Sequence, residues 1–291
     1  MSHFSVMVIG KNPEMQLEKF AEDIQIEEYC KGEVSESNKK EMLEYYNSEG
    51  NNFNSFDQCY QQFGKDWNDN NYRKDENGIW QSYSTYNLDA KWDWFTLGGR
   101  WHNFYIILKP EVVNYVNQCE CKNYPDGRKR ANQALKKDID FDAIYQISFE
   151  KATKTYREIK EKCGGEIPEL SITPDKLNEG KYSKLTIEEY RELYNSQESV
   201  QLWKKAGLLT PFGIQLEDVQ CTEEEFAHRC ADGAFSTFAY VRRGNWYEQG
   251  RMGWFGISTD NVSQESWNQQ IKKMLQDVSG DTLISIYDCH I

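Results

Sequence analysis

Histidine is rare in this chain, and its placement near the two ends is the first indication of chemistry. His3 lies near the start, and His290 lies near the end, two positions after Asp288. If strands at the two ends pair in antiparallel fashion, His3 would lie close to Asp288 and His290. Imidazole and carboxylate groups that meet can transfer protons or bind a metal ion. We take His3, His102, Asp288 and His290 as candidate catalytic residues; the alternative is that they are exposed polar residues at a sheet end.

A second group of residues combines arginine with tryptophan. Arg100 lies between Trp94 and Trp101, and Arg251 precedes Trp254 by three positions. Arginine beside aromatic rings is favoured at protein interfaces and at sites that stack nucleic-acid bases. The alternative is core packing, with the guanidinium stacked on an indole ring. We predict that these five residues contribute to binding, and the acidity of the chain favours a protein over a nucleic acid as the ligand.

Two further patterns suggest metal ligands, but neither matches an established site. Asp138, Asp140 and Asp142 would share one face of a strand and could hold Mg²⁺ or Ca²⁺, whereas in a loop they would be solvated or cap a turn. The segment Cys119-Glu-Cys121 leaves one residue between its thiols, while zinc-binding loops usually have about two to four. We therefore expect neither a resident metal ion nor a cofactor.

The established catalytic motifs are absent. The sequence contains no Gly-rich phosphate loop ending in Gly-Lys-Ser/Thr, no G-x-G-x-x-G, no G-x-S-x-G and no H-E-x-x-H. The common nucleotide-binding and hydrolase classes therefore receive no support, while a site that arose by convergence stays open.

The elements that must position these residues are best defined at the two termini. Residues 3–9 and 282–288 are rich in β-formers, and residues 265–276 place Trp267, Ile271, Met274 and Leu275 on one helical face. Strands at both ends, with a helix before the last one, predict an α+β fold. Its sheet would be mixed and mainly antiparallel, would join the N- and C-terminal strands, and would carry helical and loop insertions.

The interior of the chain gives weaker patterns. We predict a helix over residues 13–29, a strand over 143–149 and a helix over 151–162. Thr186 and Thr222 each precede a glutamate by three positions, which is the capping-box pattern at the start of a helix. The expected organisation is a core of residues 1–10, 91–150 and 205–291, an acidic helical insertion over 11–90, and a helical insertion over 151–204.

Charge limits the possible partners. The chain has 34 basic and 47 acidic residues, for a net charge of −13, and residues 1–100 hold 10 of the basic and 18 of the acidic ones. An acidic surface repels phosphate backbones and attracts basic protein surfaces. The composition also indicates a folded chain, since an aromatic fraction of 14% argues against disorder. We find no convincing signal peptide and no apolar run long enough for a membrane span, so we expect an intracellular chain with reduced cysteines.

Three segments resemble an uncharacterised family encoded by tailed phages and prophages. They are Met1–Gly10; Lys91–Trp101 followed by Asn132–Phe141; and Gly250–Gly256 together with the ending Asp281–Ile291. In length and acidity the chain also resembles the phage proteins that counter the Gabija defence system. That resemblance implies a protein of the host cytoplasm that oligomerises around a nuclease–helicase complex and blocks its access to DNA.

These observations lead to one functional hypothesis and two alternatives. We expect a phage-encoded anti-defence protein that forms a homo-oligomer and binds and inhibits a bacterial immune complex, without membrane or direct nucleic-acid contact. One alternative is a small metal-dependent or acid–base hydrolase that uses the histidine–aspartate cluster. The other is a protein that sequesters a nucleotide signal, with Arg100 and tryptophan residues lining its pocket.

Overall fold

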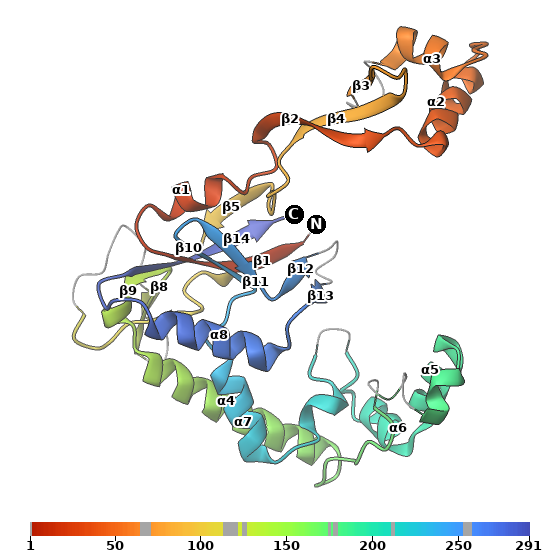
Figure 1. The fold of residues 1–291 in the computed structure, drawn as a ribbon. Coiled ribbons are helices and arrows are strands. Elements are labelled where there is room, and N and C mark those ends of the chain that lie inside the picture. The colour runs from red at the N-terminus through yellow and green to blue at the C-terminus, as the bar shows by residue number, and fades with distance from the viewer. Residues whose placement is uncertain are drawn as a thin grey trace. The chain divides into compact units, whose positions relative to one another are not determined.

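The computed structural model describes residues 2–64, 71–112, 122–123, 127–173, 176, 180–210, 213–252 and 258–291. Trp254 and the pair Cys119 and Cys121 lie outside these residues. The chain divides into two compact units. The larger unit comprises Met1–Pro13 and Thr96–Cys289, and the smaller unit comprises Glu14–Phe95 with His290–Ile291 (Figure 1).

The larger unit is built on a mixed sheet that joins the two chain ends. The described strands follow the order β11–β10–β1–β14–β5, and β9 also pairs with β14. Their bounds are β1 His3–Ile9, β5 Trp94–Leu97, β9 Gln133–Leu135, β10 Ala239–Arg242, β11 Asn245–Glu248 and β14 Leu283–His290. The α+β class and the joining of N- and C-terminal strands are thus confirmed.

β1 lies in the interior of this sheet, and five of its seven side chains are apolar. Residues 4–9 are buried, as expected for a strand covered on both faces. β1 runs parallel to β10, with Val6 opposite Ala239. The amide of Gly10 donates to the carbonyl of Leu283, while His3 lies beside Asp288, so β1 and β14 are antiparallel. This pairing brings the first and last strands together, as the sequence predicts.

Helices α4 and α8 pack beneath this sheet (Figure 1). α8 spans Gln264–Gln276, and its predicted apolar face is confirmed, because Trp267, Ile271, Met274 and Leu275 are all buried. The indole Nε1 of Trp267 donates to the carbonyl of Thr237 at 2.7 Å, which ties the helix to the segment entering β10. Ile284 and Ile286 of β14 belong to the same core cluster.

The predicted strand over residues 143–149 is wrong. These residues form the first part of α4, which spans Phe141–Lys162. Asp140 caps the helix, since its Oδ1 accepts the amide of Ala143 at 2.9 Å. The buried positions Ala143, Ala152, Tyr156 and Ile159 follow a helical spacing that a short window around residue 147 does not show.

A second apolar cluster lies in the larger unit, where α4 packs against α7. α7 spans Glu223–Asp232, and the helices α5 Ile187–Ser196 and α6 Glu198–Lys205 precede it. Trp203 and Val219 are fully buried in this cluster. The two predicted capping boxes are confirmed, because Thr186 and Thr222 each exchange hydrogen bonds with the glutamate three residues later. The larger unit also contains short strands and 3₁₀ turns. The short strands are β6 Ile106–Ile107, β7 Lys122–Asn123, β8 Lys129–Ala131, β12 Gly250–Met252 and β13 Ser258–Asp260. The 3₁₀ turns are η2 Gly99–Trp101, η3 Lys136–Asp138, η5 Gly180–Lys184 and η6 Leu216–Val219.

In its described residues, the smaller unit contains an antiparallel sheet, the helices α2 and α3, and most of α1, which spans Pro13–Glu18. Strands β2 Gln25–Glu33, β4 Trp80–Tyr86 and β3 Asn71–Lys74 pair in that order, and α2 Glu36–Ser48 and α3 Phe56–Phe63 accompany them. Val34, Met42, Phe56, Cys59 and Tyr72 form its apolar cluster.

The predicted helix over residues 13–29 is also wrong, because α1 covers only Pro13–Glu18. The turn that follows buries Phe20, and the chain then enters β2 and pairs with β4. Strand pairing with a distant segment overrides the local helical spacing here.

None of the helices among the described residues combines the length and apolar character that crossing a bilayer requires.

Candidate functional site

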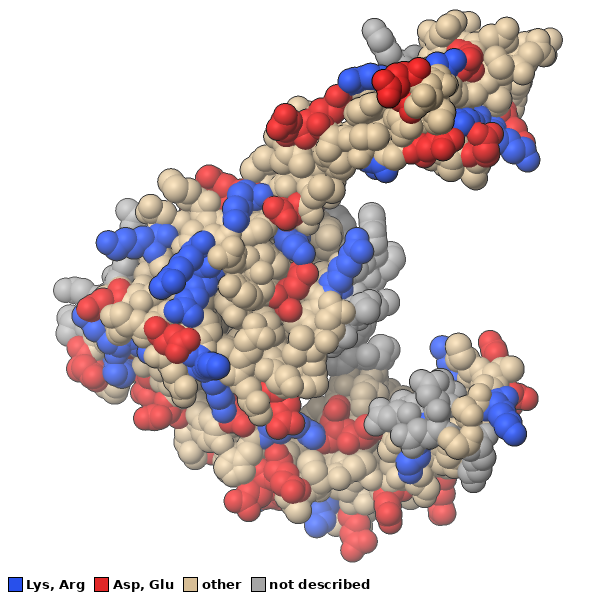
Figure 2. Space-filling view, in the orientation of Figure 1, with Lys and Arg blue, Asp and Glu red and all other residues tan. Residues whose placement is uncertain are grey.

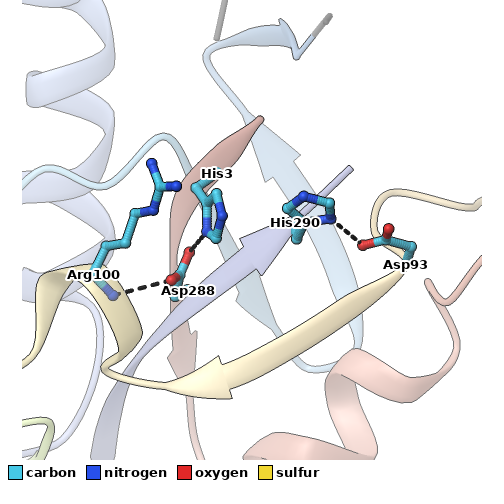
Figure 3. Close-up of polar contacts among 5 residues, drawn as sticks. All are labelled: His3, Asp93, Arg100, Asp288 and His290. Carbon is cyan, nitrogen blue, oxygen red and sulfur yellow. Dashed lines mark hydrogen bonds and ion pairs between the residues drawn. The ribbon is translucent and has the colours of Figure 1, made fainter. Parts of the chain in front are cut away.

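The buried carboxylate of Asp288 is the centre of the candidate site. Only 2% of its side chain is exposed, and both of its oxygens have partners. Oδ1 lies 3.0 Å from Nδ1 of His3 on the neighbouring strand, and Oδ2 accepts the backbone amide of Arg100 at 3.0 Å (Figure 3). When Asp288 is ionised, Nδ1 of His3 is the donor, which fixes both the tautomer and the orientation of the ring. This arrangement is that of a carboxylate that orients a histidine.

A pair of glycines brings the Arg100 amide to this carboxylate. β5 ends at Leu97, and Gly98 and Gly99 follow with φ angles of 76° and 47°. Side chains disfavour such angles, and a Cβ on Gly99 would lie 2.3 Å from Cβ of Asp288. Glycine at position 99 is therefore required by the close approach of this backbone to Asp288.

The thiol beside Asp288 is not a nucleophile. Burial and the neighbouring carboxylate raise the pKa of the Cys289 thiol well above its usual range. The thiol therefore stays protonated, and the thiolate is the reactive form of cysteine.

His290 forms a similar pair within the smaller unit. Its Nδ1 lies 2.7 Å from Oδ1 of Asp93, and the amide of Asp93 donates to the carbonyl of His290 at 3.0 Å (Figure 3). The indole of Trp94 stacks on the His290 ring, with centroids 5.2 Å apart. Sequence reasoning missed Asp93, although this residue directly precedes the candidate binding residue Trp94.

His102 has a different partner, the buried amide of Asn132. Oδ1 of Asn132 accepts the backbone amide of Asn103 at 2.6 Å, so its Nδ2 must be the atom that faces His102. Nδ2 lies 2.8 Å from Nδ1 of His102. Because Nδ2 only donates, Nδ1 accepts and Nε2 carries the ring proton. Sequence reasoning also missed Asn132, since nothing in its neighbourhood distinguishes it from an ordinary polar residue.

The predicted binding residues are dispersed. Trp101 is half-buried and packs against the main core, and Trp94 is 42% exposed on the smaller unit. Arg100 is exposed, and Arg251 is exposed in β12, opposite Thr259 of β13. Core packing therefore accounts for Trp101, whereas the guanidinium of Arg100 is accessible to a ligand.

The acidic triplet does not form a cation site on a strand. Asp138 lies in η3, Asp140 caps α4, and Asp142 lies in the first turn of the helix. Oδ2 of Asp140 also lies 3.5 Å from Nη1 of Arg128. Within the described ranges, no three potential metal-binding side chains gather. The histidine–aspartate hydrogen bonds are suited to proton transfer or to structural support.

Comparison with known proteins returned no match. No protein-family model, no curated protein and no solved structure is significantly similar to the chain. The chemistry of the site is therefore inferred from its own geometry and charge.

Proposed function

We propose that this protein acts by binding a basic surface of another protein through its smaller unit. The observation that carries this proposal is the segregation of charge. Residues 14–95 contain 8 basic and 18 acidic residues, which gives −10 of the net −13 of the whole chain. Figure 2 shows acidic side chains in the region of β2 and α2. Charge concentrated on one small unit steers association with a partner of opposite charge.

Among the residues that the structure describes, only some of these carboxylates form ion pairs with basic side chains. Glu28, Glu36 and Glu44 form ion pairs with nearby basic residues. Other exposed carboxylates of the same unit form no ion pair with any residue that the structure describes, and they are Glu22, Asp23, Glu27, Glu33, Glu41 and Glu49. Their charge is available to a partner.

The sheet of the smaller unit offers an accessible surface between these charges. Across the described residues of its three strands, only Tyr72 is buried. Tyr45 and Tyr86 are 52% and 53% exposed on the same unit. Tyrosine provides large contact areas at little entropic cost and is enriched where protein interfaces bind most tightly. Acidic groups around accessible tyrosines are suited to a basic protein surface rather than to nucleic acid.

The resemblance to phage proteins indicates which kind of partner this unit would bind. We infer a phage-encoded inhibitor that binds a bacterial immune complex, and a nuclease–helicase complex of the Gabija type is the partner that the resemblance implies. A DNA-binding groove is basic, because it must neutralise phosphates, so the acidic unit would compete with DNA for it.

An affinity capture tests this proposal. The tagged full chain is expressed in bacteria that carry several defence systems, and the native mass of the eluate is measured. We expect a stoichiometric protein complex with the wild type. The triple variant Glu27→Gln, Glu33→Gln, Glu41→Gln should capture at least about tenfold less partner, because each exposed charge at the edge of an interface contributes up to about 1 kcal/mol to the free energy of binding.

The matched control changes three exposed glutamates of the larger unit, Glu161→Gln, Glu188→Gln and Glu192→Gln. It should capture the partner as well as the wild type does. Equal capture by both triple variants, or an eluate that contains nucleic acid instead of protein, would refute binding through the acidic unit.

The hydrogen bond between His3 and Asp288 favours a second candidate, acid–base hydrolysis. A buried carboxylate that orients an imidazole is the arrangement found in general-base sites. The test is a panel of chromogenic esters, phosphoesters and peptides. Turnover that is lost in His3→Gln and retained in His102→Gln would support an enzyme, whereas the absence of turnover by the wild type would eliminate it.

A further inference from the structure

We propose that the larger unit binds a nucleotide in a cavity between α4 and the segment that follows Gly99. The cavity measures about 460 Å³, within the range of about 300–1,000 Å³ that is typical of small-molecule sites. Its walls come from residues 100–107, from Arg130 of β8, from α4 and from the loop after α7. All of these residues belong to the larger unit, so this proposal is independent of the acidic smaller unit.

The cavity is lined by groups that attract anions. Arg100, Arg130 and Lys151 line it together with His102, and its described lining residues include no aspartate or glutamate. Neither Arg100 nor Lys151 forms an ion pair with any residue that the structure describes. Positive groups gathered in a hollow of low polarity raise the local potential and concentrate anions. In a chain with a net charge of −13, this gathering selects a negatively charged ligand against the overall field.

The state of His102 suits the same ligand. The amide of Asn132 donates to Nδ1, so Nε2 carries the ring proton and is the donor nitrogen. Arginine presents a planar group that can donate two hydrogen bonds to phosphate oxygens, and lysine adds a point charge. The combination of Arg100, Arg130, Lys151 and His102 therefore matches a phosphate group or a chain of phosphates.

The remaining wall is apolar and includes an accessible aromatic ring. Phe104 is 60% exposed, and Ile107, Ile144 and Ile147 line the cavity beside it. Nη1 of Arg130 lies 3.5 Å from the backbone carbonyl of Phe104, so this arginine reaches the residue that carries the ring. A planar base can stack on an aromatic ring whatever its identity. Phosphates on one side and a planar base on the other define a nucleotide as the ligand class.

Calorimetric titration of the full chain tests this assignment with ATP, adenosine and tripolyphosphate as probes. ATP should bind saturably, and adenosine and tripolyphosphate should each bind at least tenfold more weakly, because each lacks one half of the ligand. No saturable binding of ATP would overturn the proposal. If tripolyphosphate bound as tightly as ATP, the assignment of a nucleotide as the ligand would be overturned, because the aromatic wall would then contribute nothing to the affinity.

Variants separate the two halves of the cavity. The double variant Arg100→Gln, Lys151→Gln should lower the affinity for ATP at least tenfold. Phe104→Ala should lower the affinity for ATP while leaving the affinity for tripolyphosphate unchanged. The matched control is Lys154→Gln with Lys162→Gln, which removes two exposed lysines of the same helix outside the cavity. A control that weakens ATP as much as Arg100→Gln with Lys151→Gln would show nonspecific attraction and overturn the site.

Discussion

At the scale of single residues, Asp288 determines the geometry of its surroundings. Its two oxygens bind a histidine of β1 and the backbone after a glycine pair, so three distant segments meet at one carboxylate. A buried carboxylate is costly unless hydrogen bonds compensate for its lost hydration. The Gly98-Gly99 turn brings one of these hydrogen bonds, from the Arg100 amide, to Asp288. Glycine is needed in the turn because any side chain on Gly99 would occupy the space of Asp288.

Gly99→Ala is therefore expected to destabilise the protein severely. The added Cβ would lie 2.3 Å from Cβ of Asp288 at a φ of 47°, so we expect a loss of at least about 3 kcal/mol in the free energy of unfolding from strain and overpacking. Urea titration measures it. Gly164→Ala is the control, since Gly164 has a φ of 88° but no neighbouring atom within 4 Å, and strain alone should cost about 1 kcal/mol. Equal losses for the two variants would contradict the close approach to Asp288.

The candidate site could be predicted in part at this scale. The proximity of His3 to Asp288 follows from the pairing of terminal strands, which the β-rich ends indicate. The role of Asn132 could not be foreseen, because a polar residue acquires it only when residues 98–103 fold over it. The same holds for the cavity, whose arginines and lysine lie on β8, α4 and η2 and meet only in the folded chain.

At the scale of elements, capping patterns were more reliable than hydrophobic periodicity. Thr186 and Thr222 begin helices as the sequence predicts, because a capping box involves only four consecutive residues. The segments 13–29 and 143–149 were misassigned, since their state depends on distant partners. Pairing with β4 converts residues 25–29 to strand, and packing on α7 and on the sheet stabilises residues 143–149 as helix. The strands at the two ends and the helix starts at Thr186 and Thr222 were thus predictable, whereas interior segments whose state depends on distant partners were not.

The capping box of α7 makes a pH-dependent contribution to stability. The Thr222 backbone amide and hydroxyl hold the pKa of Glu225 below its ordinary value of 4.5. A carboxylate with a lowered folded pKa stabilises the fold above its unfolded pKa, and this stabilisation is lost as the pH falls below 4.5 through the folded pKa.

Glu225→Gln should isolate this effect. Glutamine can keep the capping hydrogen bond but does not titrate. We expect the difference in unfolding free energy between wild type and Glu225→Gln to be constant from pH 7 to 5 and to shrink at lower pH, as measured by urea titration. Glu161→Gln is the control, as that exposed glutamate caps no helix. A difference that is independent of pH would contradict the assigned role.

At the scale of the whole molecule, the two units carry different electrostatics. The smaller unit holds −10 of the net charge and exposes tyrosines around a sheet with little burial. The larger unit contains the terminal-strand sheet, the Asp288 site and a cavity lined by cations. The concentration of acidic residues in the first third was visible in the sequence. What the structure adds is that they lie on a unit with its own small core and an accessible sheet.

The most direct test of binding through the acidic unit is the dissociation constant of the captured partner complex at low and high salt. Exposed charges are screened over about 10 Å at 0.1 M salt, so we expect affinity to fall at least about tenfold between 50 mM and 300 mM salt. The triple variant Glu27→Gln, Glu33→Gln, Glu41→Gln should show a clearly smaller salt dependence than the wild type. An affinity that does not change with salt, or an equal salt dependence in both proteins, would contradict the account.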